Sequence, residues 1–304
     1  MSTFNQALHS IGGARAPSRR ADRAIATADM KIGQILYSKG LLNSAQVAAV
    51  LAEQSASSQR FGETALRLGL LVPREIDDAL ALQFGYTALD PANRLLPSKV
   101  VAAYQPASTF AEALRALRSQ LRLRWFDGTP GQTAIAVTSV DRGDGKSFIT
   151  ANLGVVFAQL GEQTLIIDAD LRQPTQHQIF GVANRMGLSG LLARRAGPEE
   201  IVSVPGVAGL SVLPAGPLPP NPQELLGRPE FGRLLDGLSS RYDAILIDTP
   251  SAQQSSDVQV IAQRAGAALL VGRAGRTRSS EMGQLAAVLG HCGIRILGST
   301  LNDL

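Results

Sequence analysis

The chain has 304 residues, 45% of them apolar, which is enough hydrophobic sequence for two ordinary domains and excludes disorder of the whole chain. Its 29 basic and 25 acidic residues leave a net charge of +4, and residues 1–60 hold seven basic side chains against three acidic ones. The excess charge therefore belongs to an N-terminal arm, not to a nucleic-acid-binding surface. One cysteine and three scattered histidines exclude a disulfide framework and a zinc site, and favour a reducing, cytosolic compartment. No apolar run reaches the roughly 18 residues of a membrane-spanning helix, so we expect a partner to hold any membrane-associated form.

Residues 1–29 are rich in Ser, Gly, Ala and Arg and show no helical or strand periodicity, which predicts a flexible basic arm. The sequence then repeats itself with an offset of 29 residues. The residues that recur are Gly33, Gly40, Leu41, Leu42, Leu51, Ala52 and Gln54. Each copy predicts one helix that ends at Gly40 or Gly69 and a second that begins at Ser44 or Pro73. Two such copies predict a compact helical domain over residues 30–90.

Prolines in residues 91–108 predict a linker that lies against one domain or the other. The part that follows, residues 109–304, alternates short apolar runs with helical stretches. The apolar runs are Thr133–Val140, Thr164–Ala169, Leu210–Pro214, Ala244–Asp248, Ala268–Val271 and Ile294–Leu297. Buried strands that alternate with helices are typical of a mainly parallel sheet with helices on both faces. We therefore predict a doubly wound α/β domain.

The first of these strands leads into a glycine-rich loop and then into a helix. In this order, backbone N–H groups and a helix N-terminus can surround a polyphosphate. Lys146 would then reach the β- and γ-phosphates, and the Ser147 hydroxyl would hold magnesium. The residues expected to contact the nucleotide here are Arg142, Gly143, Asp144, Gly145, Lys146, Ser147 and Phe148. An incidental turn is the alternative, because the motif is short.

Acidic side chains stand at the ends of two other predicted strands. Asp168 and Asp170 follow one strand, and Asp248 ends another. In an open α/β sheet, ligands bind outside the carboxyl ends of the strands, so we expect all three acids to lie near the glycine-rich loop. Carboxylate and hydroxyl oxygens are ligands that Mg²⁺ prefers. The alternative is that these aspartates only cap turns or helices.

Four segments together resemble the bacterial tyrosine kinases of polysaccharide synthesis. They are Ser139–Ser147, Asp168–Pro174, Pro219–Leu226 and Tyr242–Pro250. The resemblance runs from about Pro106 to the end of the chain. It implies a MinD-like P-loop ATPase fold, in which Lys146 and Ser147 belong to the Walker A motif and Asp248 to the Walker B motif.

By the same resemblance, Lys146 would bind the phosphates, and Ser147, Asp248 and Asp168 would serve as magnesium ligands. Asp168 or Asp170 would orient or deprotonate the attacking tyrosine hydroxyl. Because phosphoryl transfer needs mainly positioning and charge neutralisation, these residue types suit it.

Charged residues at two further places are open to two interpretations. Arg172 is either a phosphate or substrate contact or one half of a structural ion pair. Glu112, Arg115 and Arg118 match the oligomerisation motif of the kinase family, in which one helix face reaches a neighbouring subunit. Charges spaced three residues apart also decorate solvated helices.

One departure from the family concerns the tyrosines. Family members usually end in a tyrosine cluster that neighbouring subunits phosphorylate, whereas this sequence carries four scattered tyrosines, at positions 37, 86, 104 and 242. Phosphorylation of such a cluster is therefore not expected. A non-kinase ATPase switch is the rival interpretation.

The N-terminal repeat resembles the MshEN domain of type II secretion ATPases, which binds cyclic di-GMP in that family. Both copies have 24 residues, and five residues separate them. The resemblance implies cyclic di-GMP contacts from Lys31, Ile32, Gly33, Arg60, Phe61 and Gly62. Lys31 replaces an arginine and lacks its planar, bidentate recognition. A docking module that binds only protein is the alternative.

Taken together, the two resemblances imply a cytoplasmic, Mg·ATP-dependent tyrosine kinase-like ATPase. It would regulate exopolysaccharide chain length or export with a transmembrane chain-length determinant, the polysaccharide co-polymerase, and would be recruited by that partner to the inner face of the membrane. A homo-oligomer and no nucleic-acid partner are expected, with cyclic di-GMP as a candidate regulator. The alternatives are the non-kinase switch and a cyclic di-GMP-sensing scaffold.

Overall fold

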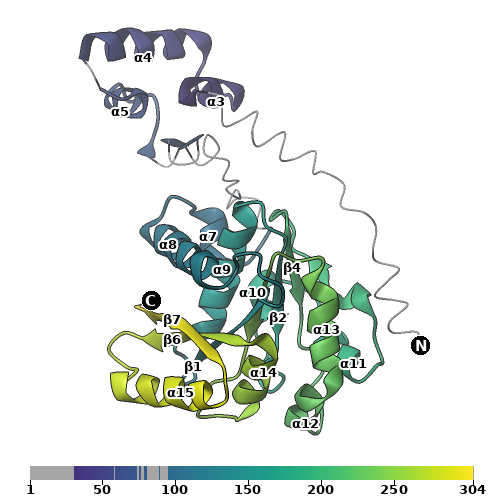
Figure 1. Ribbon diagram of the computed structural model, residues 1–304. Coiled ribbons are helices and arrows are strands. Elements are labelled where there is room, and N and C mark those ends of the chain that lie inside the picture. The colour runs from purple at the N-terminus through teal and green to yellow at the C-terminus, as the bar shows by residue number, and fades with distance from the viewer. Residues whose placement is uncertain are drawn as a thin grey trace.

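The computed structural model describes residues 31–57, 59–73, 75–76, 79–80, 89 and 95–303 (Figure 1). The predicted arm over residues 1–29 lies outside this part of the chain, as does most of the stretch in which the two predicted domains would join. Two regions can therefore be described: a small helical repeat and a larger α/β domain.

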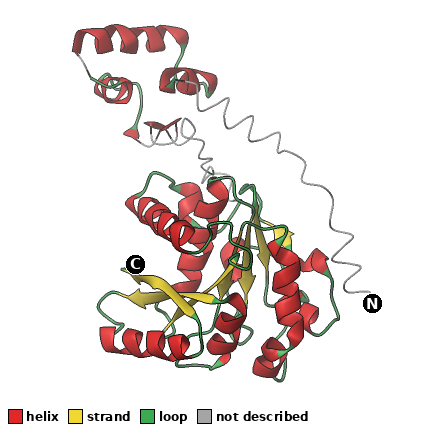
Figure 2. Cartoon of the chain, viewed as in Figure 1, coloured by secondary structure: helices red, strands yellow, loops and turns green. Residues whose placement is uncertain are grey.

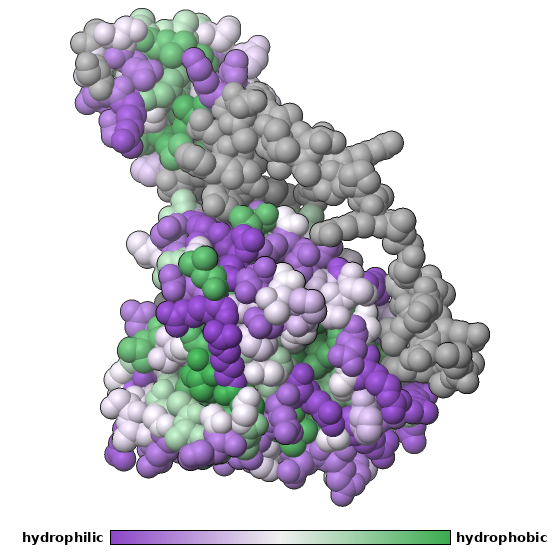
Figure 3. All heavy atoms as spheres, viewed as in Figure 1, coloured by the Kyte–Doolittle hydropathy of each residue, from purple (hydrophilic) through white to green (hydrophobic). Residues whose placement is uncertain are grey.

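The helical repeat has the internal symmetry that the sequence predicts. Helices α3 (Ile32–Ser38) and α5 (Phe61–Arg67) begin and end 29 residues apart. The glycines that follow them, Gly40 and Gly69, both have positive φ, as a left-handed helix terminus requires. Helix α4 (Ser44–Ser57) begins where predicted. The apolar faces of these helices form a hydrophobic cluster of their own, and Figure 3 shows apolar side chains of this region gathered between hydrophilic ones.

The α/β domain contains one seven-stranded sheet with the strand order β3-β4-β2-β5-β1-β6-β7. Every pairing is parallel except that between β3 and β4. The strands are β1 (Ala134–Ser139), β2 (Thr164–Asp168), β3 (Val202–Ser203), β4 (Leu210–Leu213), β5 (Ala244–Asp248), β6 (Ala267–Arg273) and β7 (Arg295–Asn302). All six predicted strands are confirmed, and the doubly wound, mainly parallel architecture is confirmed with them.

Alternate residues of each central strand supply the cores on the two faces of the sheet. In β1, Ile135 and Val137 join one cluster, whereas Ala134 and Ala136 join the other. This alternation follows from the two-residue period of a strand, and it explains why the central strands are apolar throughout. Figure 2 shows the helices covering both faces.

One face is covered by helices that precede or follow the first two strands. They are α7 (Val101–Tyr104), α8 (Thr109–Arg124), α9 (Lys146–Gln159) and α10 (Gln176–Phe180). The other face is covered by α11 (Gly187–Leu192), α12 (Pro222–Gly227), α13 (Pro229–Ser239), α14 (Asp257–Ala265) and α15 (Ser279–His291). A short 3₁₀ helix, Pro198–Glu200, precedes β3. Among the described residues, no helix is long and apolar enough to cross a membrane.

The described end of the predicted linker packs against the α/β domain. Ala102 is fully buried, its N–H donates to Asn152 Oδ1 at 2.9 Å, and its carbonyl accepts from Gln159 Nε2 at 3.0 Å. Both partners belong to α9, the helix that begins at the glycine-rich loop. Helix α7 therefore packs against α9, the helix that follows the phosphate loop.

Candidate nucleotide-binding site

The glycine-rich loop joins β1 to α9 at the carboxyl edge of the sheet. Gly143 and Gly145 have φ values of +88° and +92°, in the left-handed region that favours glycine. Helix α9 begins at Lys146 and is buried along most of its length. The first N–H groups of α9 therefore lie at the loop, and a helix N-terminus favours binding of an anion there.

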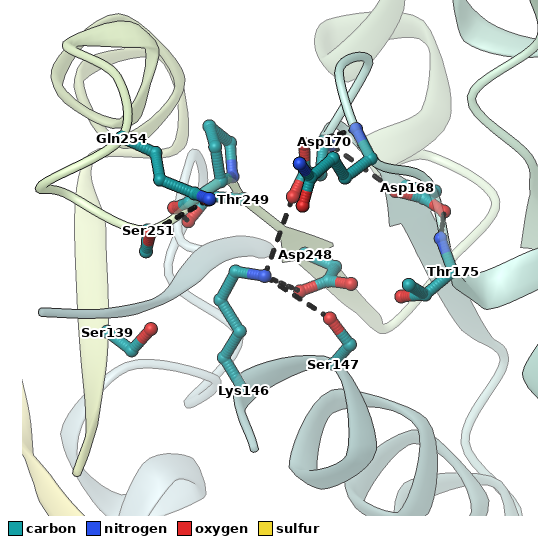
Figure 4. A network of polar contacts seen from close by, with 12 residues as sticks. Ser139, Lys146, Ser147, Asp168, Asp170, Thr175, Asp248, Thr249, Ser251 and Gln254 are labelled. Atoms are coloured by element: carbon teal, nitrogen blue, oxygen red, sulfur yellow. Dashed lines mark hydrogen bonds and ion pairs between the residues drawn. The ribbon is translucent and has the colours of Figure 1, made fainter. Parts of the chain in front are cut away.

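The ammonium group of Lys146 lies between two buried carboxylates, one at the end of β5 and one two residues after β2 (Figure 4). Its Nζ is 3.6 Å from Asp170 Oδ2, 3.9 Å from Asp248 Oδ1 and 3.3 Å from Ser147 Oγ. The strands β2 and β5 are adjacent, and Asp168 pairs with Asp248 in their register. The predicted gathering of these acids at one edge is thus present in the structure.

Asp248 is fully buried, and its two oxygens differ in their surroundings. Oδ2 accepts a hydrogen bond from Gln176 Nε2 at 2.8 Å, whereas Oδ1 has no hydrogen-bond partner. Burial raises the pKa of Asp248 above 3.8, and the charge of nearby Lys146 opposes this rise. A buried carboxylate oxygen that makes no hydrogen bond, in the same site as a serine hydroxyl, suits a hard cation. The residues present therefore fit a magnesium ion.

Asp168 and Asp170 have different environments although they are two residues apart. Asp168 Oδ2 accepts the backbone N–H groups of Thr175 and Gln176, each at 2.9 Å, and Oδ1 accepts that of Asp170 at 3.3 Å. Burial, and then repulsion from Asp248, raises the pKa of Asp168 well above 3.8. Asp170 instead lines a pocket at the loop. Asp168 thus shapes the turn after β2, and Asp170 faces the space that a ligand would enter.

This pocket has a volume of about 360 Å³. Six of the predicted nucleotide-binding residues line it, together with Asp170. They are Arg142, Gly143, Gly145, Lys146, Ser147 and Phe148. Asp144 is fully buried and does not line it. The lining residues that sequence reasoning missed are Lys99, Gln173, Thr175, Gln178, Ile179 and Gln254.

Gln176 is a further residue that sequence reasoning missed. Its side chain is fully buried, and its Nε2 donates both to Asp248 Oδ2 and to the carbonyl of Ser147, the latter at 3.0 Å. It therefore ties the start of α10 to β5 and to the beginning of α9. In the sequence, only its place at a helix start soon after Asp168-x-Asp170 could have pointed to Gln176.

Arg172 makes one of its two predicted contacts in the structure. Its Nε is 3.0 Å from Oδ2 of Asp257, a buried residue at the start of α14. The structure therefore has the ion pair, and Arg172 does not line the pocket.

The three residues of the predicted oligomerisation motif lie on α8 but differ in exposure. Arg115 pairs with Glu112 at 2.8 Å and donates to the carbonyl of Pro106 at 2.7 Å. Arg118 is buried and donates to the carbonyl of Val156 in α9 at 2.7 Å. The side chain of Glu112 is 72% exposed. Within one chain, the arginines thus fasten α8, and Glu112 faces solvent.

In the helical repeat, the residues predicted to contact cyclic di-GMP occupy matching positions. Lys31 and Arg60 precede α3 and α5 and are exposed, whereas Phe61 is buried and Ile32 is partly buried. A Cβ on Gly33 would lie 3.1 Å from the Phe61 ring, and one on Gly62 would lie 3.0 Å from Ile76 Cγ2. Helix packing thus accounts for both glycines, and the two basic side chains remain accessible.

Comparison with known proteins identifies the fold. Residues 135–300 match the CobQ/CobB/MinD/ParA nucleotide binding domain, which is more than half of the chain. CapB of Staphylococcus aureus is 37% identical over 201 residues, which cover 66% of this chain and 87% of CapB. The tyrosine-protein kinase YwqD of Bacillus subtilis is 34% identical over 203 residues, which cover 67% of this chain and 85% of YwqD. The chain therefore belongs to the bacterial tyrosine-protein kinases of the CobQ/CobB/MinD/ParA nucleotide-binding family.

A solved structure agrees with this assignment. The kinase domain of the Escherichia coli tyrosine kinase ETK superposes with a TM-score of 0.64 at 34% identity, over 67% of this chain and 80% of that domain. The full-length etk chain of Escherichia coli K12 is much longer, and the match covers 27% of it. The predicted kinase resemblance and P-loop fold are confirmed for the α/β domain.

Proposed function

We propose that the site at the carboxyl edge of the sheet binds ATP with Mg²⁺ and transfers the γ-phosphoryl group to a tyrosine hydroxyl. The observation that carries this proposal is the Lys146 ammonium group between Asp170 and Asp248, next to a loop with two left-handed glycines. Backbone N–H groups of the loop and the start of α9 would bind the phosphates, and Lys146 would neutralise their charge.

Ser147 and Asp248 would hold the magnesium ion, because Asp248 Oδ1 is buried without a hydrogen bond of its own, and this oxygen and the Ser147 hydroxyl lie 3.9 Å and 3.3 Å from Lys146 Nζ. When bound, the ion would neutralise charge on the β- and γ-phosphate oxygens. Asp168 as a third ligand remains a prediction. Both of its oxygens accept backbone N–H groups in the structure, so Asp168 would have to share an oxygen between these donors and the ion.

Asp170 is the residue we propose to orient and deprotonate the attacking tyrosine. It lines the pocket, and its Oδ1 accepts the N–H of Gln173 at 2.9 Å, which fixes the carboxylate. The proton of the tyrosine hydroxyl would pass to Asp170 Oδ2, the oxygen that faces Lys146.

Exopolysaccharide chain-length control is the biological role we propose, with a transmembrane co-polymerase as partner that recruits the protein to the inner face of the membrane. The family membership supports it. We also propose that copies of the chain associate through α8, where the Glu112 carboxylate, paired with Arg115 within the chain, is 72% exposed and faces the solvent from which a neighbouring copy would approach.

A non-kinase ATPase switch is the second candidate, and the placement of the described tyrosines supports it. Of those that the structure describes, Tyr37 is 56% exposed, Tyr242 is buried, and Tyr104 exchanges hydrogen bonds with the backbone of Leu96. The described part of the chain thus exposes few tyrosine hydroxyls that could accept a phosphoryl group.

Phosphotyrosine formation separates the two candidates. We expect the full chain, incubated with Mg·ATP and a Glu–Tyr copolymer, to form phosphotyrosine that mass spectrometry detects, because Asp170 is placed to accept a tyrosine proton. The Asp170→Asn variant, which keeps the size of the side chain, should hydrolyse and transfer far more slowly. ATP hydrolysis without phosphotyrosine, in the presence of the membrane partner, would establish the switch instead.

For the helical repeat we propose a cyclic di-GMP site in which Lys31 and Arg60 bind the phosphates. The matching, exposed positions of these two cations before α3 and α5 support it. The docking-module alternative is favoured by Tyr37, Leu51 and Val72, apolar side chains that are each at least half exposed.

Calorimetric titration with cyclic di-GMP tests this proposal. We expect micromolar binding that the Arg60→Ala variant loses, because a guanidinium–phosphate contact is charge-assisted. The matched control is Arg67→Ala, at the other end of α5, which should bind normally. No binding by the wild-type chain, with or without Mg·ATP, would leave the repeat as a docking module.

A further inference from the structure

The phosphate loop contains a carboxylate that its proposed function does not use. Asp144 is fully buried and turned away from the pocket. Its Oδ2 accepts the backbone N–H of Asp141 at 2.9 Å, and its Oδ1 accepts the hydroxyl of Thr277 at 3.0 Å. Within one side chain, the two oxygens thus join the start of the loop to the turn after β6.

The Thr277 hydroxyl has a defined direction. Its oxygen accepts the backbone N–H of Arg273 at 2.8 Å, so its single proton is available for Asp144. The Arg273 guanidinium group also reaches the loop, where Nη1 donates to the carbonyl of Gly143 at 3.2 Å. The turn between β6 and α15 therefore contacts the loop through side chains from both of its ends.

The end of β7 makes a third contact. Asn302 is buried, and its Nδ2 donates to the carbonyl of Asp144 at 3.2 Å. The approach is close enough that a Cβ on Gly145 would lie 2.0 Å from Asn302 Nδ2. Gly145 is thus required both by its φ of +92° and by the side chain of Asn302.

These contacts set the direction of the loop's peptide groups. In a trans peptide the carbonyl and the following N–H point in opposite directions. Because the carbonyls of Gly143 and Asp144 point to Arg273 and Asn302, the N–H groups of Asp144 and Gly145 point away from β6 and β7. A loop held in this way presents N–H groups to an anion without a rearrangement on binding.

We propose that Thr277, Asn302 and Asp144 are positioning residues that hold the phosphate loop in its anion-binding conformation. The inference rests on the proposed nucleotide site, and it assigns a function to three side chains that do not line the pocket. The last two strands of the sheet thereby control the affinity of a site that lies mostly on β1, β2 and β5.

The test compares Thr277→Val, which removes the hydroxyl and keeps the shape, with Thr277→Ser, which keeps the hydroxyl. Loss of the hydroxyl leaves Asp144 Oδ1 buried without a donor. We expect the Kd for ATP with Mg²⁺, measured by calorimetry, to rise about tenfold in Thr277→Val and to stay within about twofold of wild type in Thr277→Ser. Equal affinities in wild type and Thr277→Val, or equal weakening in both variants, would overturn the proposal.

Hydrogen exchange of the ligand-free chain gives a readout that does not depend on nucleotide binding. We expect the amides of residues 141–147 to exchange faster in Thr277→Val and in Asn302→Asp, while those of β1 and β5 keep the wild-type rate. Unchanged loop exchange would contradict the positioning function. If the wild-type chain binds no ATP but loop exchange is still faster in the variants, the proposed nucleotide site is rejected, whereas the positioning of the loop by Thr277 and Asn302 is retained. If Asn302→Asp lowers the Tm, the Thr277 pair alone decides.

Discussion

Replacing Lys146 by methionine is expected to lower kcat for ATP turnover at least about a hundredfold, the usual loss when one charge-stabilising group leaves an active site. The ammonium group is the positive side chain 3.6 Å from Asp170 and 3.9 Å from Asp248. Without it, the two buried carboxylates would face the incoming phosphates uncompensated. ADP release from the purified full chain, followed at saturating Mg²⁺, measures the effect.

The matched control is Lys39→Met, which makes the same change at an exposed residue after α3. It should turn ATP over at the wild-type rate. A Lys146→Met variant that keeps more than about a tenth of the wild-type kcat would show that the chemistry does not run through this site.

Replacing Asp248 by asparagine is expected to lower turnover as strongly as Lys146→Met does, but not to lower the stability of the ligand-free chain. The change removes the charge that would hold magnesium, so kcat should fall about a hundredfold or more. The Tm of the ligand-free chain at pH 8 should equal or exceed that of wild type. Turnover assays and thermal melts on the same preparations measure both effects.

The stability effect follows from the direction of the pKa shift. Because burial raises the pKa of Asp248 above 3.8, the folded state holds this proton more tightly than the unfolded state does. Ionisation of Asp248 therefore costs stability as the pH rises from 3.8 through the raised pKa. The Tm of wild type relative to Asp248→Asn should fall across this window. A Tm at pH 8 that drops in the variant would mean that the charge stabilises the ligand-free fold.

The sequence was most informative where chemistry and periodicity are local. Parallel strands buried on both faces are continuous apolar runs, so β1, β2 and β5 and the acids at their ends could be located from the sequence. Strand β3 was missed because its two residues are exposed and form no apolar run. The second half of β7 was missed for a related reason, since exposed and buried residues are mixed there.

Contacts between distant segments could not be predicted in this way. Asp144 was expected to face a nucleotide because it lies in the glycine-rich loop, yet its partners Thr277 and Asn302 are 133 and 158 residues further along the chain. Similarly, the spacing of Glu112, Arg115 and Arg118 places them near one another on α8, but only the tertiary structure shows that Arg118 is buried against α9.

Titration of the full chain with ATP tests the central claim most directly, namely that the Lys146 site binds the nucleotide together with Mg²⁺. One titration is made in Mg²⁺ and one in a chelator, each on wild type and on Lys146→Met. We expect wild type to bind one ATP per chain in Mg²⁺, with affinity at least about tenfold weaker in the chelator, because the charges of the phosphates and Asp248 are then not neutralised. Lys146→Met should show little binding in either condition. Equal binding by Lys146→Met and wild type, or no binding by wild type in Mg²⁺, would contradict the account.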